Sequence, residues 1–310
     1  MVLSEGVIQQ RDIMKKEMFF CIGAQKAGTT TLHDILKQNP DICLPKEKET
    51  HFFSIPKLNK RGLAYYFQEC FDEKSRVQAH IMGEVDPSYC FFPGTFERIA
   101  SQLSSDYKLK FIFVLRNPVH RAYSHYLMSL RRGHETLTFE DAVEKETERL
   151  DDFFGYVHFS YIKRGHYFEQ VKELLNFFSE DQVLFMLFEE DLLQNTQETL
   201  SRIHRFLELR PFEYNYSLKS NPASQPRSTL IRDLIYGKSL LKNLLKAWVP
   251  SGELRRKLKS RTDKLNSKGM DKKKLSSELS GRIWHEHFEK DLVLLEKCIG
   301  KPLKYRKADL

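Results

Sequence analysis

Three short, mainly apolar runs stand out along the chain: Met18–Ile22, Lys110–Leu115, which is apolar after its first residue, and Val183–Phe188. Unbroken apolar character over a short run is typical of a strand that is buried on both faces, as in a parallel sheet. Each run ends in a polar loop, and each loop leads into a segment with apolar residues at helical spacing. Strand, loop and helix recurring in this order predict an α/β fold, a three-layer sandwich with a central, mainly parallel sheet and helices on both faces.

The remaining elements follow from the same reading of apolar spacing. Two short strand-like segments, Asp41–Leu44 and Gly83–Tyr89, lie between the first and second apolar runs. Asn39-Pro40 is a turn signal that ends the first helix. The helices expected along the chain are Thr30–Gln38, Leu63–Phe71, Glu97–Leu103, a helix beginning at Pro118, Phe139–Arg149, Tyr161–Phe178, Gln197–Leu207 and Ser276–Ile299.

The loop after the first apolar run has the residues of a phosphate-binding loop. Gly23 and Gly28 enclose small residues and one lysine, Lys26, and threonines open the following helix. Backbone N–H groups and the helix dipole at such a loop favour a doubly charged oxyanion, and small residues let the backbone approach it. The nucleotide-triphosphate version places its lysine after the second glycine, whereas Lys26 precedes Gly28. A plain strand-to-helix turn is the structural alternative, because turns also favour Gly and Thr.

A second anion-binding element follows the strongest predicted strand. Arg116 stands at the end of that strand, Asn117 suits a helix N-cap, and Pro118 suits the first helical position. Arg116 can bind a phosphate through two hydrogen bonds, and Ser124 is close enough along the helix to donate to the same anion. A triphosphate hydrolase needs an Asp at a strand end to hold magnesium, and this strand ends in Arg116. The strand that ends in Glu189 is a weaker substitute, so we expect two anion clamps and no metal.

Composition limits the class of protein. No run of about 18 apolar residues exists, so we expect no membrane span. The five cysteines are widely spaced and form no C-x-x-C, which favours reduced thiols and, with an N-terminus that lacks an apolar signal core, a cytoplasmic location. Without internal repeats, the chain is expected to form a flexible arm at residues 1–17 and a single domain at residues 18–310.

The positive charge is concentrated in one segment of that domain. Residues 238–274 hold thirteen Lys and Arg against three acidic residues, whereas the whole chain carries a net charge of +8. This segment is expected to be mostly helical. A solvated helical face is the simplest explanation, and an anionic acceptor, an anionic membrane surface or nucleic acid are the functional ones.

Taken together, these residues resemble the sulfotransferases that use 3′-phosphoadenosine 5′-phosphosulfate (PAPS). The segment Gly23–Thr30 resembles that family's loop for the 5′-phosphosulfate, and Phe111–Ser124 resembles its 3′-phosphate element. Within the family, Glu49-Thr50-His51-Phe52-Phe53 resembles the Glu-x-His-Phe-Phe of the heparan-sulfate-type and related bacterial branch. The resemblance implies a P-loop NTPase-like fold and PAPS as co-substrate. It implies contacts to PAPS from Gln25, Lys26, Ala27, Gly28, Thr29, Thr30, Arg116, Ser124 and, less directly, Arg227.

The resemblance also implies catalytic roles. Glu49 is the first candidate for the base that takes a proton from the acceptor, and His51 is a second base or the group that orients Glu49. In an extended segment the two side chains would face the same side. Lys26 would neutralise charge on the leaving nucleotide. Glu49 as an exposed charge and His51 as a packed loop histidine are the structural alternatives. Some glycan-acting relatives carry a lysine in the element that corresponds to Gly83–Tyr89, and this chain has none there.

The expected activity is therefore metal-independent, in-line transfer of a sulfuryl group to a hydroxyl or amine of a glycan, lipid or small molecule. A kinase-like phosphotransferase with a variant loop is one alternative, and it predicts magnesium dependence. A non-catalytic anion or nucleic-acid binder that uses residues 238–274 is another, and it predicts steep salt dependence. Trp248 is nearly the only aromatic residue in that segment, so we expect no nucleic-acid partner.

Overall fold

The fold is built on a parallel sheet of five strands, in the order β2-β3-β1-β4-β5. The computed structural model describes residues 16–215, 224–226, 267–269, 275–303 and 305. The strands of this sheet are β1 (Lys16–Gly23), β2 (Ile42–Cys43), β3 (Ile81–Val85), β4 (Tyr107–Leu115) and β5 (Val183–Leu187). The α/β class with a central parallel sheet is therefore confirmed, and the three apolar runs form β1, β4 and β5 as predicted.

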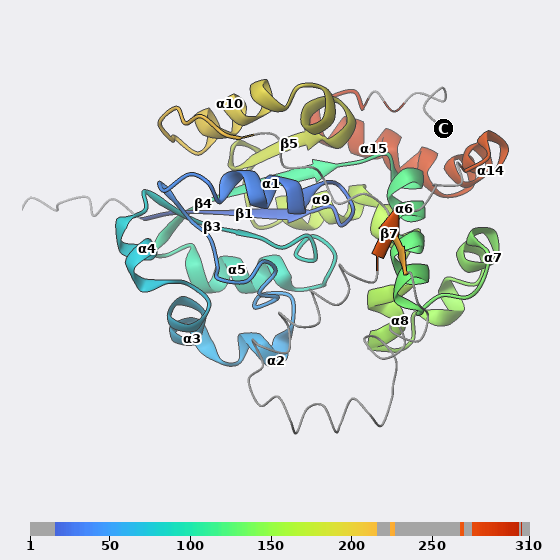
Figure 1. The fold of residues 1–310 in the computed structure, drawn as a ribbon, viewed down its shortest axis with the longest axis horizontal. Helices are drawn as coiled ribbons and strands as arrows, with labels where there is room; N and C mark the ends of the chain where they lie inside the picture. Colours follow the sequence, from blue (N-terminus) through green and yellow to red (C-terminus); the bar gives the residue numbers. More distant parts are fainter. Residues whose placement is uncertain (1–15, 216–223, 227–266, 270–274, 304, 306–310) are drawn as a thin grey trace, which may run out of the picture.

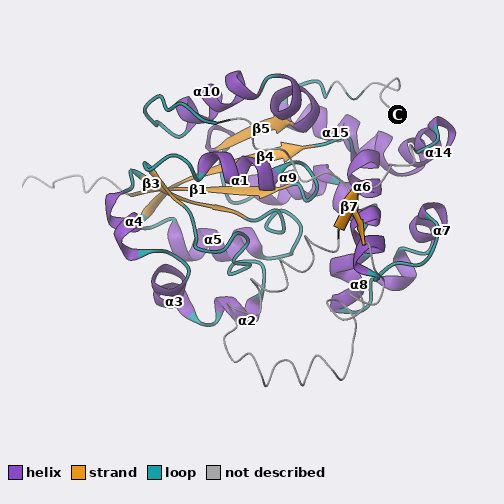
Figure 2. Ribbon diagram, in the orientation of Figure 1, coloured by secondary structure: helices purple, strands orange, loops and turns teal. Residues whose placement is uncertain are grey.

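Helices surround the sheet, and their arrangement can be followed in Figure 1. Helices α3, α4 and α5 gather beside β3, α10 lies beside β5, and α6, α7 and α8 lie beyond the strand ends. Figure 2 shows the arrowheads of β4 and β5 pointing toward α6. The helices are α1 (Thr29–Leu36), α2 (Pro56–Asn59), α3 (Gly62–Glu69), α4 (Glu73–Gln78), α5 (Thr95–Leu103), α6 (Pro118–Arg132), α7 (Phe139–Glu144), α8 (Phe153–His158), α9 (Tyr167–Leu175), α10 (Thr196–Phe206), α14 (Ser277–Ile283) and α15 (Glu289–Ile299).

Short turns of other helix types complete the fold. 3₁₀ turns span Thr147–Arg149, Lys163–Gly165 and Glu180–Gln182, and π-helical turns span Phe188–Gln194 and Trp284–Phe288. A small antiparallel pair joins β6 (Ser224–Pro226) to β7 (Ser267–Gly269). Two helix predictions were too long, because Tyr161–Phe178 contains a 3₁₀ turn before α9 and Phe139–Arg149 divides after α7. Three short helices, α2, α4 and α8, were not predicted.

Burial on both faces explains why the central strands are mainly apolar; the buried Lys110 of β4 is paired with Glu17 and Glu208. Every residue of β4 from Leu109 to Leu115 is buried, and so is every residue of β1 from Met18 to Gly23. Since successive side chains of a strand point to opposite faces, both faces of the sheet are covered. The polar residues that end these strands are therefore the ones that are free to form a site at the carboxyl edge, where ligands bind in open α/β sheets.

Gly83 in β3 gives a direct test of this packing. A Cβ at Gly83 would lie 2.0 Å from Cε1 of Phe19, whose ring is fully buried on the neighbouring strand. We expect Gly83→Ala to lower the free energy of unfolding by about 1–3 kcal/mol, measured by denaturant titration, because the ring has no room to move. Gly281→Ala is the matched control. That glycine lies inside α14 with nothing within 4 Å of the added Cβ, so this change is expected to be neutral or slightly stabilising. Equal stability of the two variants would contradict the packing.

Candidate functional site

The loop between β1 and α1 is held in a conformation that exposes its backbone to the carboxyl edge of the sheet. The N–H of Ala24 donates to the carbonyl of Val114 on β4 at 2.7 Å, which ties the loop to the neighbouring strand. Gly28 has φ 80°, and a Cβ there would lie 2.7 Å from the ring of Phe188, so only glycine fits. Lys26 also lies in the left-handed region, with φ 74°. A non-glycine residue held in this region is a feature that recurs at ligand-binding sites.

Lys26 lies among positive charges. Its Nζ is 3.8 Å from Sδ of Met128 on α6. Burial, together with the positive charges of Arg132, Arg131 and Arg116, lowers the pKa of Lys26 to about 7. Gathering these cations costs electrostatic free energy that an anionic ligand would recover. The site is therefore suited to an anion that carries more than one charge.

Arg116 joins the end of β4 to the same loop. Its Nη1 donates to the carbonyl of Lys26 at 2.6 Å, and its guanidinium lies 4.8 Å from the centre of the Phe188 ring. The carbonyl of Arg116 accepts from the Tyr167 hydroxyl at 2.9 Å, which fixes the backbone at this point. Nε of Arg116 lies 3.7 Å from a carboxylate oxygen of Glu189, at the end of β5. Groups from the ends of β1, β4 and β5 thus meet at one edge of the sheet.

Helix α6 carries further residues of this site along one face. Asn117 caps the helix, since its Oδ1 accepts from the N–H groups of Val119 and His120 at 3.0 and 3.2 Å. Ser124 is half-buried and lies one turn before Met128, which contacts Lys26, so both occupy one face.

Arg131 and Arg132 follow Met128 by three and four residues and extend that face. Their charges act on Lys26, yet the sequence analysis did not single them out. The spacing of seven and eight residues from Ser124 was the signal that could have found them.

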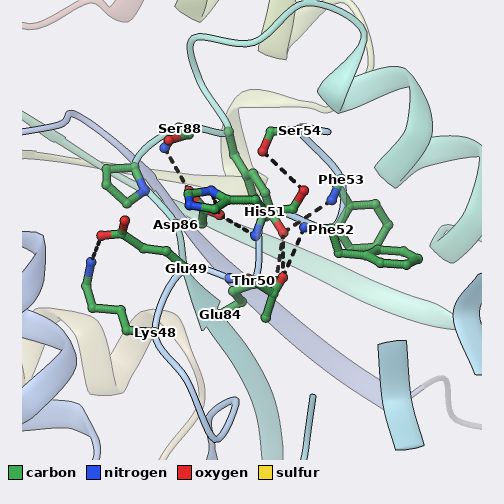
Figure 3. Close-up of polar contacts among 12 residues, drawn as sticks. Lys48, Glu49, Thr50, His51, Phe52, Phe53, Ser54, Glu84, Asp86 and Ser88 are labelled. Carbon is green, nitrogen blue, oxygen red and sulfur yellow. Dashed lines mark hydrogen bonds and ion pairs between the residues drawn. The ribbon is translucent and has the colours of Figure 1, made fainter. Parts of the chain in front are cut away.

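The second group of candidate residues lies on the loop between β2 and α2. The expectation that Glu49 and His51 share a face of an extended segment was wrong. Glu49 has φ 65° and His51 has φ 55°, so both lie in the left-handed region and the segment turns between them. Figure 3 shows the result, in which the Glu49 carboxylate pairs with Lys48 and His51 is directed to Asp86. Tertiary contacts, and not strand geometry, therefore set the direction of each side chain.

Asp86 holds His51 by two contacts to one carboxylate oxygen. Oδ2 of Asp86 lies 2.9 Å from the backbone nitrogen of His51 and 2.9 Å from its Nδ1. Burial lowers the pKa of His51, but the hydrogen bond to Asp86 and the negative charges around the ring outweigh burial and raise the pKa above its ordinary value. His51 therefore holds a proton more strongly than a free histidine does.

Glu84 supports the same loop from inside the sheet. It is fully buried, and Oε1 accepts from the N–H and hydroxyl of Thr50 at 2.9 and 2.5 Å. Oε2 accepts from the hydroxyls of Tyr66 and Tyr89 at 2.6 and 3.0 Å. Burial, together with the negative charge of Asp86, raises the pKa of Glu84 to about 7. Four donors on a buried carboxyl explain why a loop with strained dihedral angles stays in place.

Glu84 and Asp86 also connect the two groups of residues. The N–H of Asp86 donates to the carbonyl of Cys21 at 3.0 Å, and the N–H of Cys90 donates to the carbonyl of Ile22 at 3.0 Å. The end of β3 thus lies against the end of β1, just before the Lys26 loop. The sequence analysis treated Gly83–Tyr89 only as a strand and a loop. Two acidic residues at the end of a buried strand were the signal that it did not use.

Some predicted residues lie outside the described part of the chain. Arg227 and most of residues 238–274 are among them, so the structure describes neither the proposed contact of Arg227 nor the basic segment. Thr29 is buried at the start of α1, whereas Thr30 is exposed. Within the described residues, no helix has the length and apolar character needed to cross a membrane.

The sequence of this chain is similar to those of known sulfotransferases. The family model described as a sulfotransferase domain matches residues 16–293. The human heparan sulfate glucosamine 3-O-sulfotransferase 3B1 is 34% identical over 191 residues, which cover 61% of this chain and 45% of that protein. The membrane-associated sulfotransferase kil1 of Dictyostelium discoideum is 23% identical over 273 residues, covering 63% of this chain and 57% of that protein. The chain thus spans about half the length of these curated relatives.

One solved structure resembles this chain over most of its length. The crystal structure of a sulfotransferase from Alicyclobacillus acidocaldarius shares 27% sequence identity and has a TM-score of 0.58. The match covers 92% of this chain and 96% of that one.

Proposed function

This chain belongs to the sulfotransferase domain family, and from that premise we propose that it transfers a sulfuryl group from PAPS to a hydroxyl or amine acceptor. The observation that carries the proposal is the position of Lys26 among Arg116, Arg131 and Arg132, inside a loop bounded by two glycines. PAPS is a polyanion whose 5′-phosphosulfate and 3′-phosphate are well separated. A site with cations on a loop and at a second strand end suits a ligand of that kind.

The residues proposed to hold the co-substrate divide into two groups. The loop residues Gln25, Lys26, Ala27, Gly28, Thr29 and Thr30 would hold the 5′-phosphosulfate, and Arg116 with Ser124 would hold the 3′-phosphate. We also propose that Arg227, which lies outside the described residues, contacts the same ligand. When bound, PAPS supplies a sulfuryl group on a phosphate leaving group. Lys26 would neutralise the charge that this leaving group gains, which is where a preorganised cation lowers a barrier most.

Glu49 is proposed as the residue that takes the proton of the acceptor. As the acceptor oxygen or nitrogen bonds to sulfur, the bond from sulfur to the bridging phosphate oxygen breaks, and its electron pair leaves with adenosine 3′,5′-bisphosphate. The acceptor proton passes to the Glu49 carboxylate, which keeps the charges balanced. Lys48 pairs with the Glu49 carboxylate and helps to fix its position on the loop.

The acceptor and the location are broader proposals. One relative is named for sulfating a glucosamine of heparan sulfate, which supports a glycan as the class of acceptor. A lipid and a small molecule are the other proposed classes. A cytoplasmic location rests on the free cysteines at Cys21, Cys43, Cys70, Cys90 and Cys298. The description of another relative as membrane-associated makes cell fractionation the appropriate check.

A transfer assay tests the proposed activity. Purified protein is incubated with PAPS that carries ³⁵S in its sulfuryl group, together with glycan, phenol, alcohol and amine acceptors, in the presence of EDTA. The proposal predicts labelled product and release of adenosine 3′,5′-bisphosphate. It is wrong if no acceptor is labelled while the same protein transfers phosphate from magnesium-ATP.

A further inference from the structure

Glu189, at the end of β5, places a carboxylate beside the arginine that ends β4. Its Oε1 accepts from the backbone N–H of Asn117 at 3.3 Å and lies 3.7 Å from Nε of Arg116. The same turn of chain also contacts the loop after β1, because the ring of Phe188 would lie 2.7 Å from a Cβ at Gly28. A carboxylate is therefore held beside the cations of the proposed co-substrate site.

The distances show that Glu189 does not orient Arg116. A separation of 3.7 Å suits an ion pair and is too long for a hydrogen bond, and Nε of Arg116 has no hydrogen-bond partner among the described residues. The guanidinium is oriented instead by its 2.6 Å hydrogen bond to the carbonyl of Lys26 and by the ring of Phe188, whose centre is 4.8 Å away. The contribution of Glu189 is consequently its charge, which the N–H of Asn117 holds in place.

The two acidic residues that follow Glu189 have other surroundings. Asp191 accepts from the N–H of Leu187 at 2.6 Å and from Nη1 of Arg202 at 2.5 Å, so its charge is balanced inside its own segment. In the described part of the chain, the Glu190 side chain makes no hydrogen bond or ion pair with the end of β4. Glu190 thus carries the same charge as Glu189 one residue further on, without the same contact.

We propose that Glu189 limits the affinity of the Arg116 clamp for a nucleotide phosphate, so that the bisphosphate product can leave after sulfuryl transfer. The inference rests on the proposed function and deepens it, since the 3′-phosphate proposed to bind Arg116 is present in both PAPS and the product. A fixed negative charge beside Arg116 repels that phosphate, and across a few ångströms this repulsion amounts to about a tenfold change in affinity. Because product release is often the slow step of an enzyme, a clamp without this charge would slow turnover.

The test combines a change in the protein with a change in the ligand. Glu189→Gln removes the charge from a side chain that is 30% exposed and keeps an amide oxygen for the N–H of Asn117, so the fold should be retained. At low salt we expect its affinity for adenosine 3′,5′-bisphosphate, measured by titration calorimetry, to rise about tenfold. The dissociation rate, measured by stopped-flow displacement, should fall by a similar factor. Adenosine 5′-phosphate, which lacks the 3′-phosphate, should bind the variant and the unaltered protein about equally. Glu190→Gln is the matched control and should bind both nucleotides as the unaltered protein does.

The outcomes that overturn this role of Glu189 are distinct from those that overturn the proposed function. Unchanged or weaker binding of the bisphosphate by Glu189→Gln contradicts the role, and so does an unchanged dissociation rate. Equal tightening for both nucleotides, or the same tightening in Glu190→Gln, assigns the effect to overall charge and not to the contact with Arg116. Loss of a magnesium-dependent binding in Glu189→Gln makes Glu189 a metal ligand instead. The proposed function fails separately, if the unaltered protein binds the bisphosphate no more tightly than adenosine 5′-phosphate.

Discussion

Replacing Lys26 with methionine is expected to lower kcat for sulfuryl transfer by about a hundredfold to a thousandfold, the loss seen when a preorganised charge-stabilising group is removed. Methionine keeps the length and apolar character of the side chain, so it retains packing against Met128 and removes only the charge. The affinity for adenosine 3′,5′-bisphosphate should fall by a smaller factor, because Arg116 and the loop N–H groups remain. Steady-state kinetics and calorimetric titration measure the two effects separately.

The control for this change is Lys37→Met. Lys37 is the exposed C-cap residue at the other end of α1, so its loss should leave kcat and affinity unchanged. If Lys26→Met retains full turnover, Lys26 does not stabilise the leaving group, and the proposed catalytic role of this loop is wrong.

The lowered pKa of Lys26 adds a pH signature to the same prediction. In the empty site this pKa is about 7, so the amine is mostly neutral at pH 8. A bound polyanion raises the pKa again, and the complex therefore takes up a proton as it forms. Affinity for the bisphosphate should consequently fall as the pH rises above 7. Titration calorimetry at pH 8 in two buffers of different ionisation enthalpy should report proton uptake for the unaltered protein and less uptake for Lys26→Met.

Replacing Glu49 with glutamine is expected to lower kcat by about a hundredfold or more while leaving bisphosphate affinity nearly unchanged, since general-base catalysis contributes about 10²–10⁴ to rate. The amide keeps the size of the side chain and cannot accept the acceptor proton. Glu49 contacts Lys48 and belongs to the loop that Glu84 and Asp86 hold, so the change should disturb the loop little.

Glu47→Gln is the matched control, because Glu47 is exposed two residues earlier on the same loop. It should retain full transfer. Activity that survives Glu49→Gln assigns the proton to another group and removes Glu49 from the mechanism.

The parts of the fold that the sequence predicted are those with a strong local signal. The strands β1 and β4 are buried on both faces over most of their length, and β5 at the sheet edge is partly buried, so each contains an apolar run. The beginning of α6 was predictable because Asn117 and Pro118 suit the first positions of a helix, and Asn117 does cap it. The Lys26 loop was recognisable from its glycines, since its left-handed Gly28 needs a residue without a Cβ.

The parts that were missed depend on contacts between distant segments. The turn at Glu49 and His51 is held by hydrogen bonds that the loop N–H groups donate to Glu84 and Asp86, which lie more than thirty residues away in the sequence. The division of Tyr161–Phe178 follows Gly165, where a Cβ would lie 2.7 Å from the ring of Phe288 on a C-terminal turn. Apolar spacing carries no information on such pairings, so it predicted the elements and not the loop geometry.

The central claim, that the Lys26 and Arg116 site binds a 3′-phosphorylated adenosine nucleotide without a metal, is tested most directly by titration calorimetry of the purified protein. Adenosine 3′,5′-bisphosphate and ATP are titrated in parallel, each with magnesium and with EDTA. The account predicts tight binding of the bisphosphate that is the same in both conditions, and weak binding of ATP. Tight binding of ATP that requires magnesium, with weak binding of the bisphosphate, would contradict it.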